Sequence, residues 1–388
     1  MKQDTVIVTA GRDPEANHGV VNPPVYHAST ILHPTLKALR SASGKDYRKV
    51  VYGRYGTPTT FALQEAMAAL EGGDWAIACA SGKAVIATVL MAFLEKGDHA
   101  LITDSAYSPT RALASGLLTR YGIETTFYDP AIGAGIAELI RPDTKVVYVE
   151  SPGSLTFEVQ DLPAIAAAAH KKGAVVIADN TWGAGYFYRP LELGADVSLQ
   201  AGTKYIVGHS DAMLGIAVAR EKHMDRLWET YTTLGNNIAP DDAYLGQRGL
   251  RTLAVRLNRH YETGLKVARW LKQRPEVLRV LHPALPDHPG HDIWKRDFTG
   301  ASGLFSILIK RASEARLAAM LDPMQLFGMG YSWGGYESLI VPSDPKKART
   351  AVAWREKGTL LRLHVGLEDP DDLIAELDAG LGRLCRAR

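Results

Sequence analysis

Features of secreted, membrane-spanning and nucleic-acid-binding proteins are scarce in this sequence. Cys79 and Cys385 are the only cysteines in 388 residues, too few for a disulfide framework. The 44 lysines and arginines nearly balance the 42 aspartates and glutamates, so no excess charge favours nucleic acid or an anionic membrane. The N-terminus lacks a signal peptide's long apolar core, and the apolar run 77–94 is interrupted at 81–83. We expect a cytoplasmic protein with no membrane or nucleic-acid partner and no metal site.

The order of apolar segments predicts an α/β protein. From Thr57 to about Leu250, segments typical of strands alternate with segments typical of helices, which favours a mostly parallel sheet with helices on both faces. The expected strands are 75–79, 100–103, 125–128, 146–149, 175–178 and 197–199. The expected helices are 61–70, 84–94, 112–120 and 162–172.

Three regions differ in character. Residues 1–56 are rich in Pro, Gly and Asn and show no clear period, so we expect an irregular extension that packs on another surface, such as a neighbouring subunit. Residues 57–250 form the alternating region. Residues 251–388 predict a smaller α/β domain, with helices at 253–273, 312–320 and 371–384 and strands at 304–309 and 360–365.

The stretch from Val175 to Asp211 carries the strongest chemical signal. Asp179 follows one predicted strand and Lys204 follows the next, and ligands of open α/β sheets bind beyond the carboxyl ends of such strands. A lysine and a carboxylate placed there suit pyridoxal phosphate, because the lysine forms a Schiff base and the carboxylate keeps the pyridine nitrogen protonated. The alternative is that Lys204 is an ordinary solvated lysine and Asp179 caps a loop.

Two further segments could complete a cofactor site at the same edge. The turn Cys79-Ala80-Ser81-Gly82-Lys83 joins a predicted strand to a predicted helix, and the free amides of Gly82 and Lys83 would suit a phosphate. Thr203 could add a hydroxyl. Tyr107 follows the strand 100–103 and could stack on a pyridine ring. Each segment alone also suits a protein without a ligand.

The C-terminal region places an arginine in an apolar strand. Arg362 has leucine on either side, so it needs an anionic partner, which could be a substrate carboxylate or a structural salt bridge. We expect His364 to point to the opposite face and to be structural. The loop Tyr331-Ser332-Trp333-Gly334-Gly335 presents large rings either to a pocket or to the core.

These motifs together resemble the Cys/Met-metabolism family of pyridoxal-phosphate enzymes of fold type I. The resemblance runs through nearly the whole chain, in YGRYGTPT (52–59), SGKA (81–84), AYSP (106–109), DNTW (179–182), TKYIVGHSD (203–211) and LRLHVGLED (361–369). It implies a transferase-like fold with a mostly parallel seven-stranded sheet and a smaller C-terminal α/β domain. The implied cofactor is pyridoxal 5'-phosphate.

The resemblance also implies a role for each matching residue. Lys204 carries the cofactor and removes the Cα proton, Asp179 pairs with the pyridine nitrogen, and Tyr107 stacks on the ring. The implied phosphate ligands are Gly82, Lys83 and Thr203. Many members have a phosphate-binding serine at the position of Ala201. Methionine is common in the family at the position of Lys83.

Other matches concern the substrate and a second subunit. Arg362 would hold the substrate α-carboxylate, beside a loop that contributes Tyr331, Ser332 and Trp333. Tyr52 and Arg54 match residues that reach the phosphate of a neighbouring subunit, which implies a homotetramer of two catalytic dimers. Tyr55, which follows Arg54, departs from members that have arginine there.

Trp333 and the segment Ser151-Pro152-Gly153-Ser154-Leu155 resemble members that break the bond at Cβ rather than Cγ. The implied enzyme is a carbon–sulfur lyase of methionine biosynthesis and transsulfuration. It would convert cystathionine to homocysteine, pyruvate and ammonia, and would act on related cysteine S-conjugates. The alternatives are a γ-acting lyase or synthase of the same fold and, from another class, a cofactor-binding regulator with little turnover.

Overall fold

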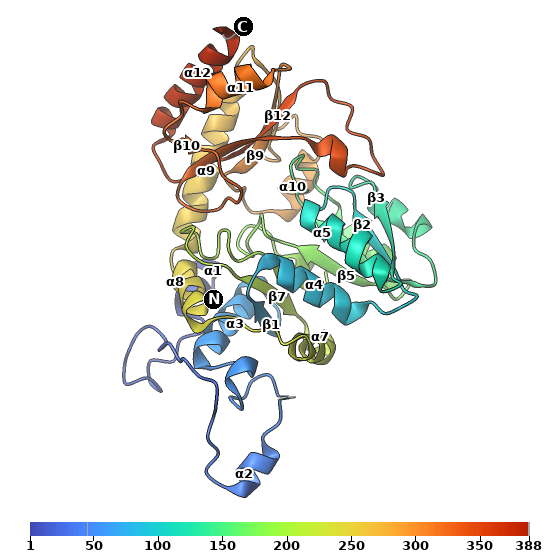
Figure 1. Cartoon of the computed structure of the whole chain (residues 1–388), viewed down its shortest axis with the longest axis vertical. Coiled ribbons are helices and arrows are strands. Elements are labelled where there is room, and N and C mark those ends of the chain that lie inside the picture. The colour runs from blue at the N-terminus through green and yellow to red at the C-terminus, as the bar shows by residue number, and fades with distance from the viewer. Residues whose placement is uncertain (45, 387–388) are drawn as a thin grey trace.

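Seven short apolar strands form the central sheet of the molecule (Figure 1). The structure is a computed structural model and describes residues 1–44 and 46–386. The sheet order is β1-β7-β6-β5-β4-β2-β3, and every neighbouring pair is parallel except the two made by β7. The strands are β1 (Trp75–Cys79), β2 (His99–Thr103), β3 (Glu124–Tyr128), β4 (Thr144–Glu150), β5 (Val175–Asp179), β6 (Val197–Gln200) and β7 (Gly215–Ala219).

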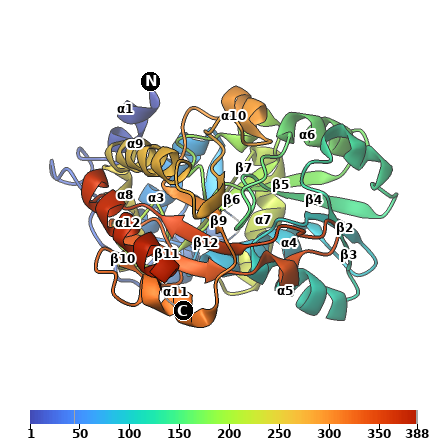
Figure 2. The same ribbon diagram turned by 90° about the horizontal axis from the view of Figure 1, so that it is seen from above.

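Helices cover both faces of this sheet because its strands are apolar on both sides (Figure 2). In β1, Ala76 and Ala78 belong to one core, whereas Trp75 and Ile77 belong to the other. Helices that pack in the first core include α3 (Pro58–Glu71), α6 (Leu162–His170) and α8 (Pro240–Leu250). Helices in the second core are α4 (Gly82–Phe93), α5 (Ser108–Leu113) and α7 (Glu221–Thr233).

A second, five-stranded sheet lies above the first in Figure 1 and has its own core. Its order is β10-β11-β12-β9-β8, and the long helix α9 (Leu253–Leu271) leads into it. The strands are β8 (Val277–Leu281), β9 (Leu304–Ile309), β10 (Phe327–Gly328), β11 (Ser338–Ser343) and β12 (Thr359–His364). The other helices are α10 (His291–Asp297), α11 (Glu314–Leu321) and α12 (Pro370–Arg386).

The predicted fold class is confirmed, and several local predictions need correction. No element was expected at β7, α7 or α8. The expected helix 112–120 lies within a continuous helical segment that begins earlier, at α5, and takes a π-helical form at η2 (Ala114–Leu118). The expected irregular extension contains α1 (Gln3–Thr9), whose Ile7 is buried in the first core, and α2 (Leu36–Ser41). The domain boundaries near residues 56 and 250 stay predictions.

Four short 3-10 segments complete the secondary structure: η1 (Gly53–Tyr55), η3 (Gly133–Glu138), η4 (Pro190–Leu193) and η5 (Pro345–Ala348). Among the residues that the structure describes, no helix has the length and apolar character needed to cross a bilayer. Cys79 is fully buried in β1, and burial raises the pKa of its thiol to about 12, as expected for an inert core cysteine.

Candidate active site

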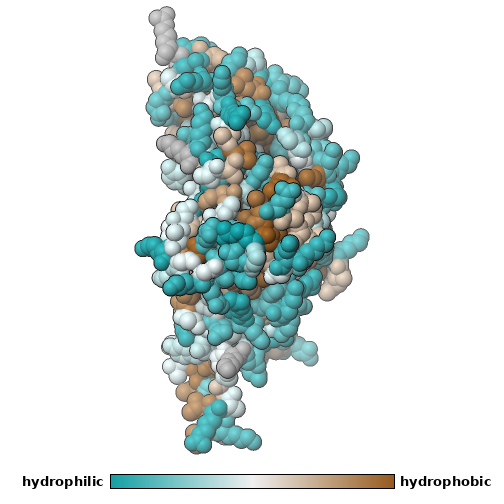
Figure 3. All heavy atoms as spheres, turned by 90° about the vertical axis from the view of Figure 1, so that its right-hand side faces the viewer, coloured by the Kyte–Doolittle hydropathy of each residue, from teal (hydrophilic) through white to brown (hydrophobic). Residues whose placement is uncertain are grey.

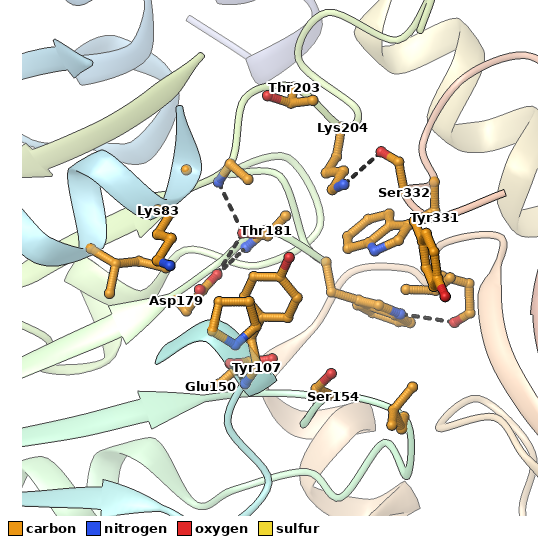
Figure 4. A pocket seen from close by; sticks show the side chains of 18 of the residues that line it. Lys83, Tyr107, Glu150, Ser154, Asp179, Thr181, Thr203, Lys204, Tyr331 and Ser332 are labelled. Atoms are coloured by element: carbon orange, nitrogen blue, oxygen red, sulfur yellow. Dashed lines mark hydrogen bonds between the residues drawn. The ribbon is translucent and has the colours of Figure 1, made fainter. Parts of the chain in front are cut away.

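A cavity of about 370 Å³ lies between the carboxyl ends of the parallel strands and the C-terminal domain (Figure 4). It brings together ten of the twelve predicted site residues: Gly82, Lys83, Tyr107, Asp179, Thr203, Lys204, Tyr331, Ser332, Trp333 and Arg362. The large domain therefore supplies the predicted cofactor ligands, and the C-terminal domain supplies the predicted substrate ligands.

Lys204 reaches into the cavity from the loop that follows β6. Its Nζ donates a hydrogen bond to Ser332 Oγ at 2.6 Å and lies 5.4 Å from the centre of the Trp333 ring. Burial and the positive charge of Arg362 lower the pKa of this amine to about 8. A lowered pKa increases the neutral fraction, which is the form that attacks an aldehyde or accepts a proton.

Asp179 ends β5 and is held by three hydrogen bonds. Its Oδ1 accepts from the Thr181 N–H at 3.0 Å and from Thr181 Oγ1 at 2.5 Å, and its Oδ2 accepts from the Tyr148 hydroxyl at 3.1 Å. Burial raises the pKa of Asp179, while these hydrogen bonds oppose the rise. No cationic side chain of the described residues pairs with Asp179, so it fits the protonated nitrogen of a pyridine ring.

Glu150 is a second cavity carboxyl, which the sequence analysis missed. It ends β4, lies beside Asp179 in the sheet register, and accepts a hydrogen bond from the Tyr107 N–H at 2.7 Å. Burial and the nearby Asp179 raise the pKa of Glu150 well above its usual value. A signal was present, because Glu150 directly follows the predicted strand 146–149, as Asp179 follows 175–178.

The amino end of α4 fits a phosphate group. Ser81 caps the helix by accepting from the Ala84 N–H at 3.2 Å, which leaves Gly82 and Lys83 as the first helical residues. A Cβ on Gly82 would lie 2.5 Å from Ala201 Cβ, so only glycine allows the helix to approach this loop so closely. Thr203 Oγ1 already bonds the Leu214 backbone, at 3.0 and 3.2 Å.

Tyr107 projects into the cavity in Figure 4, with its side chain partly exposed at 47%. The bond from its N–H to Glu150 fixes its backbone at the start of α5. An exposed ring at the cavity wall has the free face that stacking requires. Its role as a stacking residue stays a prediction.

Arg362 lies on β12 without a carboxylate partner. Its Nη2 donates to the Ser332 carbonyl at 2.9 Å, and its buried Nε has no hydrogen-bond partner among the described residues. Among the described residues, no carboxylate forms an ion pair with Arg362, so the structure does not support a structural salt bridge. Burial lowers the pKa of Arg362. An unpaired guanidinium nitrogen fits the carboxylate of an amino-acid ligand.

The loop between β10 and β11 is pressed against Lys204. Ser332 has φ +95°, a left-handed conformation that is uncommon for a residue with a Cβ, and a Cβ on Gly334 would lie 2.8 Å from the Lys204 carbonyl carbon. The expectation that His364 points to the opposite face from Arg362 is wrong, because residues two apart on a strand share a face. Its assignment as a structural residue stays a prediction. His364 and Arg362 both contact this loop, since His364 Nε2 lies 3.1 Å from the Gly334 N–H.

Tyr52 and Arg54 lie outside the Lys204 cavity. They line a second cavity of about 320 Å³ together with Asn237, and Arg54 Nη1 donates to the Thr232 carbonyl at 3.0 Å. A single chain therefore does not bring these two residues to Lys204. Tyr55 packs against Arg54 and Trp228 of its own chain.

Comparisons with known proteins identify the family of this chain. Residues 4–382 match the family model described as Cys/Met metabolism PLP-dependent enzyme. The chain is 47% identical to the cystathionine beta-lyase MetC of Escherichia coli, over 99% of both chains. It is 41% identical to an L-alanine/L-glutamate racemase of Wolbachia pipientis, over 99% of this chain and 98% of that protein.

More distant matches include a cystathionine gamma-lyase of Bos taurus, 35% identical over 97% of this chain and 93% of that protein. The solved structure of metB from Corynebacterium glutamicum superposes with a TM-score of 0.91 at 32% identity, over 99% of this chain and 98% of the other. This likeness confirms the predicted fold type. With a family model that spans nearly the whole chain, the protein belongs to the Cys/Met metabolism family of PLP-dependent enzymes.

Proposed function

We propose that this protein is a carbon–sulfur lyase that converts L-cystathionine to homocysteine, pyruvate and ammonia. The observation that carries the proposal is the arrangement of Lys204, Ser332, Trp333 and Arg362 around one cavity, where a base, a free guanidinium and a bulky ring meet. The 47% identity to a cystathionine beta-lyase over the full length supports it, and the gamma-lyase is more distant. We place the reaction in the cytoplasm, with the other enzymes of amino-acid metabolism.

Pyridoxal phosphate, when bound, supplies an electron sink for a carbanion at Cα. We infer that the start of α4, at Gly82 and Lys83, holds its phosphate together with Thr203. Asp179 would hold a proton at the ring nitrogen, because the carboxylate is buried and no described residue gives it a cationic partner. Tyr107 covers one face of the ring.

Arg362 would hold the substrate's α-carboxylate, because its buried Nε has no hydrogen-bond partner among the described residues. Lys204 then removes the Cα proton as the neutral amine, a form that its lowered pKa makes more abundant near neutral pH. Ser332 Oγ fixes the position of Nζ. The thiol leaves from Cβ, and hydrolysis of the remaining three carbons gives pyruvate and ammonia.

Trp333 favours elimination at Cβ over elimination at Cγ. The γ reaction needs a second proton removed, from Cβ, and therefore more room for the base to move. Displacing reacting atoms by about 1 Å can lower a rate by about a hundredfold, so a ring that lies this close to Nζ is large enough to select the reaction.

The 2-oxo acid formed from L,L-cystathionine tests the proposal directly. We expect pyruvate from the wild-type protein and a larger share of 2-oxobutyrate from Trp333→Leu, with Trp333→Phe as the control that keeps an aromatic ring. Mainly 2-oxobutyrate from the wild-type protein would make this a γ-acting relative. Formation of D-alanine from L-alanine at a rate above pyruvate formation would favour racemisation, which the similarity to the Wolbachia protein makes the second candidate.

We further propose a homotetramer built from two catalytic dimers. Tyr52 and Arg54 lie away from their own chain's Lys204 cavity, where a neighbouring subunit could receive them. The arm that carries α2 projects at the bottom of Figure 1 and bears exposed apolar side chains, seen as brown spheres in Figure 3. These exposed residues include Leu32 (89%), Leu36 (60%) and Leu39 (55%).

Mixed oligomers test the shared site. Arg54→Ala and Lys204→Ala subunits should each have low activity alone. In a mixed dimer, one of the two sites receives both intact side chains, so we expect partial recovery of activity. Mixed oligomers that are verified by mass and remain inactive would show that each site is built within one chain.

A further inference from the structure

Two backbone segments, residues 179–181 and 198–201, carry groups that face the cavity. Along each segment, successive side chains point alternately to the cavity and to the opposite side. Asp179, Thr181 and Ala201 form a chain on the cavity side, in which the Ala201 N–H donates to Thr181 Oγ1 at 3.0 Å and Thr181 Oγ1 donates to Asp179 Oδ1. The segments are joined where the Asn180 N–H donates to the Leu199 carbonyl at 2.7 Å. The distance between these segments therefore determines how Asp179 lies relative to the loop that carries Lys204.

On the other side of the same segments lies Glu71, the last residue of α3 and a fully buried carboxyl. Its Oε1 accepts from Gln200 Nε2 at 2.6 Å, and its Oε2 accepts from Ser198 Oγ and from Asn180 Nδ2, both at 3.0 Å. Asn180 Nδ2 also bonds the Tyr188 carbonyl at 2.9 Å. Glu71 thus joins the segment after β5 to the last residues of β6.

All the direct hydrogen-bond partners of Glu71 are neutral. Arg189, whose charge acts on Glu71 without a hydrogen bond to it, forms an ion pair with Glu192 at 2.7 Å. Burial raises the pKa of Glu71 to about 7, although the bonds from Ser198, Asn180 and Gln200 oppose the rise. A buried carboxyl without a cation is costly for stability, so its benefit must come from the geometry that its bonds impose.

We propose that Glu71 is a positioning residue for the cofactor site: by binding Asn180, Ser198 and Gln200 from behind, it sets the spacing between Asp179 and the Lys204 loop. Glu71 does not line the cavity, so it acts through these neighbours. The proposal rests on the assigned cofactor and not on which carbon–sulfur bond is broken.

The same two strands offer a matched control at their other end. Asp196, just before β6, is also a buried carboxylate, and its Oδ2 accepts from the Val176 N–H of β5 at 2.9 Å. It lies at the amino ends of the strands, away from the cavity, and it pairs with His170, Lys222 and His223. Asp196→Asn therefore perturbs the same strand pair without approaching the cofactor.

The experiment compares Glu71→Gln and Asp196→Asn in the full-length protein. The glutamine places an NH₂ group against side chains that donate hydrogen bonds. We expect Glu71→Gln to raise the dissociation constant for pyridoxal phosphate, titrated into the stripped protein, about tenfold. It should also shift the pH midpoint of the visible absorption band of the lysine-bound cofactor. Asp196→Asn should lower the melting temperature and leave both readouts within about twofold of wild type.

Cofactor binding by the wild-type protein, measured in the same titration, checks the assignment on which the proposal rests. If Glu71→Gln lowers the melting temperature but leaves the dissociation constant and the band unchanged, as the control does, Glu71 is merely structural and the proposal is wrong. If Glu71→Gln does not fold, Ser198→Ala decides, because it removes a single hydroxyl from the same network. We expect that variant to weaken cofactor binding about threefold, and no change would overturn the proposal.

Discussion

The two ends of the β5–β6 strand pair place a buried carboxylate in opposite environments. At the amino end, burial alone would raise the pKa of Asp196, but hydrogen bonds from His223, the Val176 N–H and other donors hold it below its usual value. At the carboxyl end, Glu71 has neutral partners and a pKa raised to about 7. At the amino end, Asp196 pairs with Lys222 and two histidines. At the carboxyl end, Glu71 accepts hydrogen bonds from neutral side chains.

The same contrast extends to the groups around each carboxylate. Beside the cavity, Asp179 has no cationic partner and Arg362 Nε no hydrogen-bond partner among the described residues, and Ser332 has a left-handed backbone. Asp196, in contrast, pairs with Lys222 and two histidines. A polar group that has no partner costs stability unless a ligand pairs with it. We therefore expect the groups at the carboxyl end to bind a ligand, and Asp196 at the amino end to stabilise the fold.

The largest effect should come from Lys204→Ala. Loss of the amine removes both the attachment point and the base, so we expect turnover to fall by about 10⁴-fold or more, with the fold retained. Steady-state pyruvate release and circular dichroism measure the two quantities. Borohydride reduction of the wild-type protein should attach the cofactor to the peptide that contains Lys204. Near-normal turnover in the variant would remove Lys204 from the mechanism.

Asp179→Ala should have the next largest effect, about a hundredfold on the exchange of the substrate Cα proton. Without this carboxylate the ring nitrogen is less often protonated and the carbanion is less stable. Exchange is followed by NMR in deuterated water. Asp179→Asn is the control that keeps the shape of the side chain without its charge. Unchanged exchange in Asp179→Ala would contradict the assigned role.

Arg362→Ala should act mainly on substrate affinity. Losing charge-assisted hydrogen bonds to the α-carboxylate should raise KM by roughly 10- to 100-fold. Arg362→Lys should recover only part of this loss, because lysine lacks the bidentate fork. A normal KM in Arg362→Ala would mean that the substrate carboxylate is bound elsewhere.

The effects on stability against pH, as distinct from those on turnover and affinity, should have opposite signs at the two ends. The pKa of Asp196 is lowered on folding, so its contribution is present above about pH 4 and is lost as the pH falls further. The pKa of Glu71 is raised, so folding is favoured at low pH, and up to about 3 kcal/mol is lost as the pH rises from about 4.5 through about 7. Urea unfolding of wild type, Asp196→Asn and Glu71→Gln between pH 3 and 9 measures both. Parallel pH profiles for the three proteins would refute the contrast.

Much of the fold was predictable because its strands are continuous apolar runs. The expected strands 75–79 and 304–309 match β1 and β9 at both ends. Strand β7 was missed because Gly-Ile-Ala-Val-Ala is short and rich in residues without a strand preference. Its antiparallel place between β1 and β6 depends on pairings between residues far apart in the sequence.

Within the site, Asp179 was predictable because it directly follows the expected strand 175–178, and Lys204 because it lies in the loop after the expected strand 197–199. Glu71 was not, because a glutamate at the end of a helix is usually exposed to solvent. Its burial arises only when the last residue of α3 meets Asn180, Ser198 and Gln200 in the folded chain. The unusual φ of Ser332 likewise depends on how the loop meets Lys204. The shared face of His364 and Arg362 was predictable, because residues two apart on a strand point to the same side.

The division of the cavity between two domains has a practical consequence for engineering. Trp333, Ser332 and Arg362 belong to the C-terminal domain, whereas the predicted cofactor ligands belong to the large sheet. A mutant library confined to residues 304 and 331, with Ser332, Trp333 and Arg362 unchanged, would vary the cavity wall contributed by the C-terminal sheet and its loop. We expect it to change which thioether is accepted without changing which bond is broken.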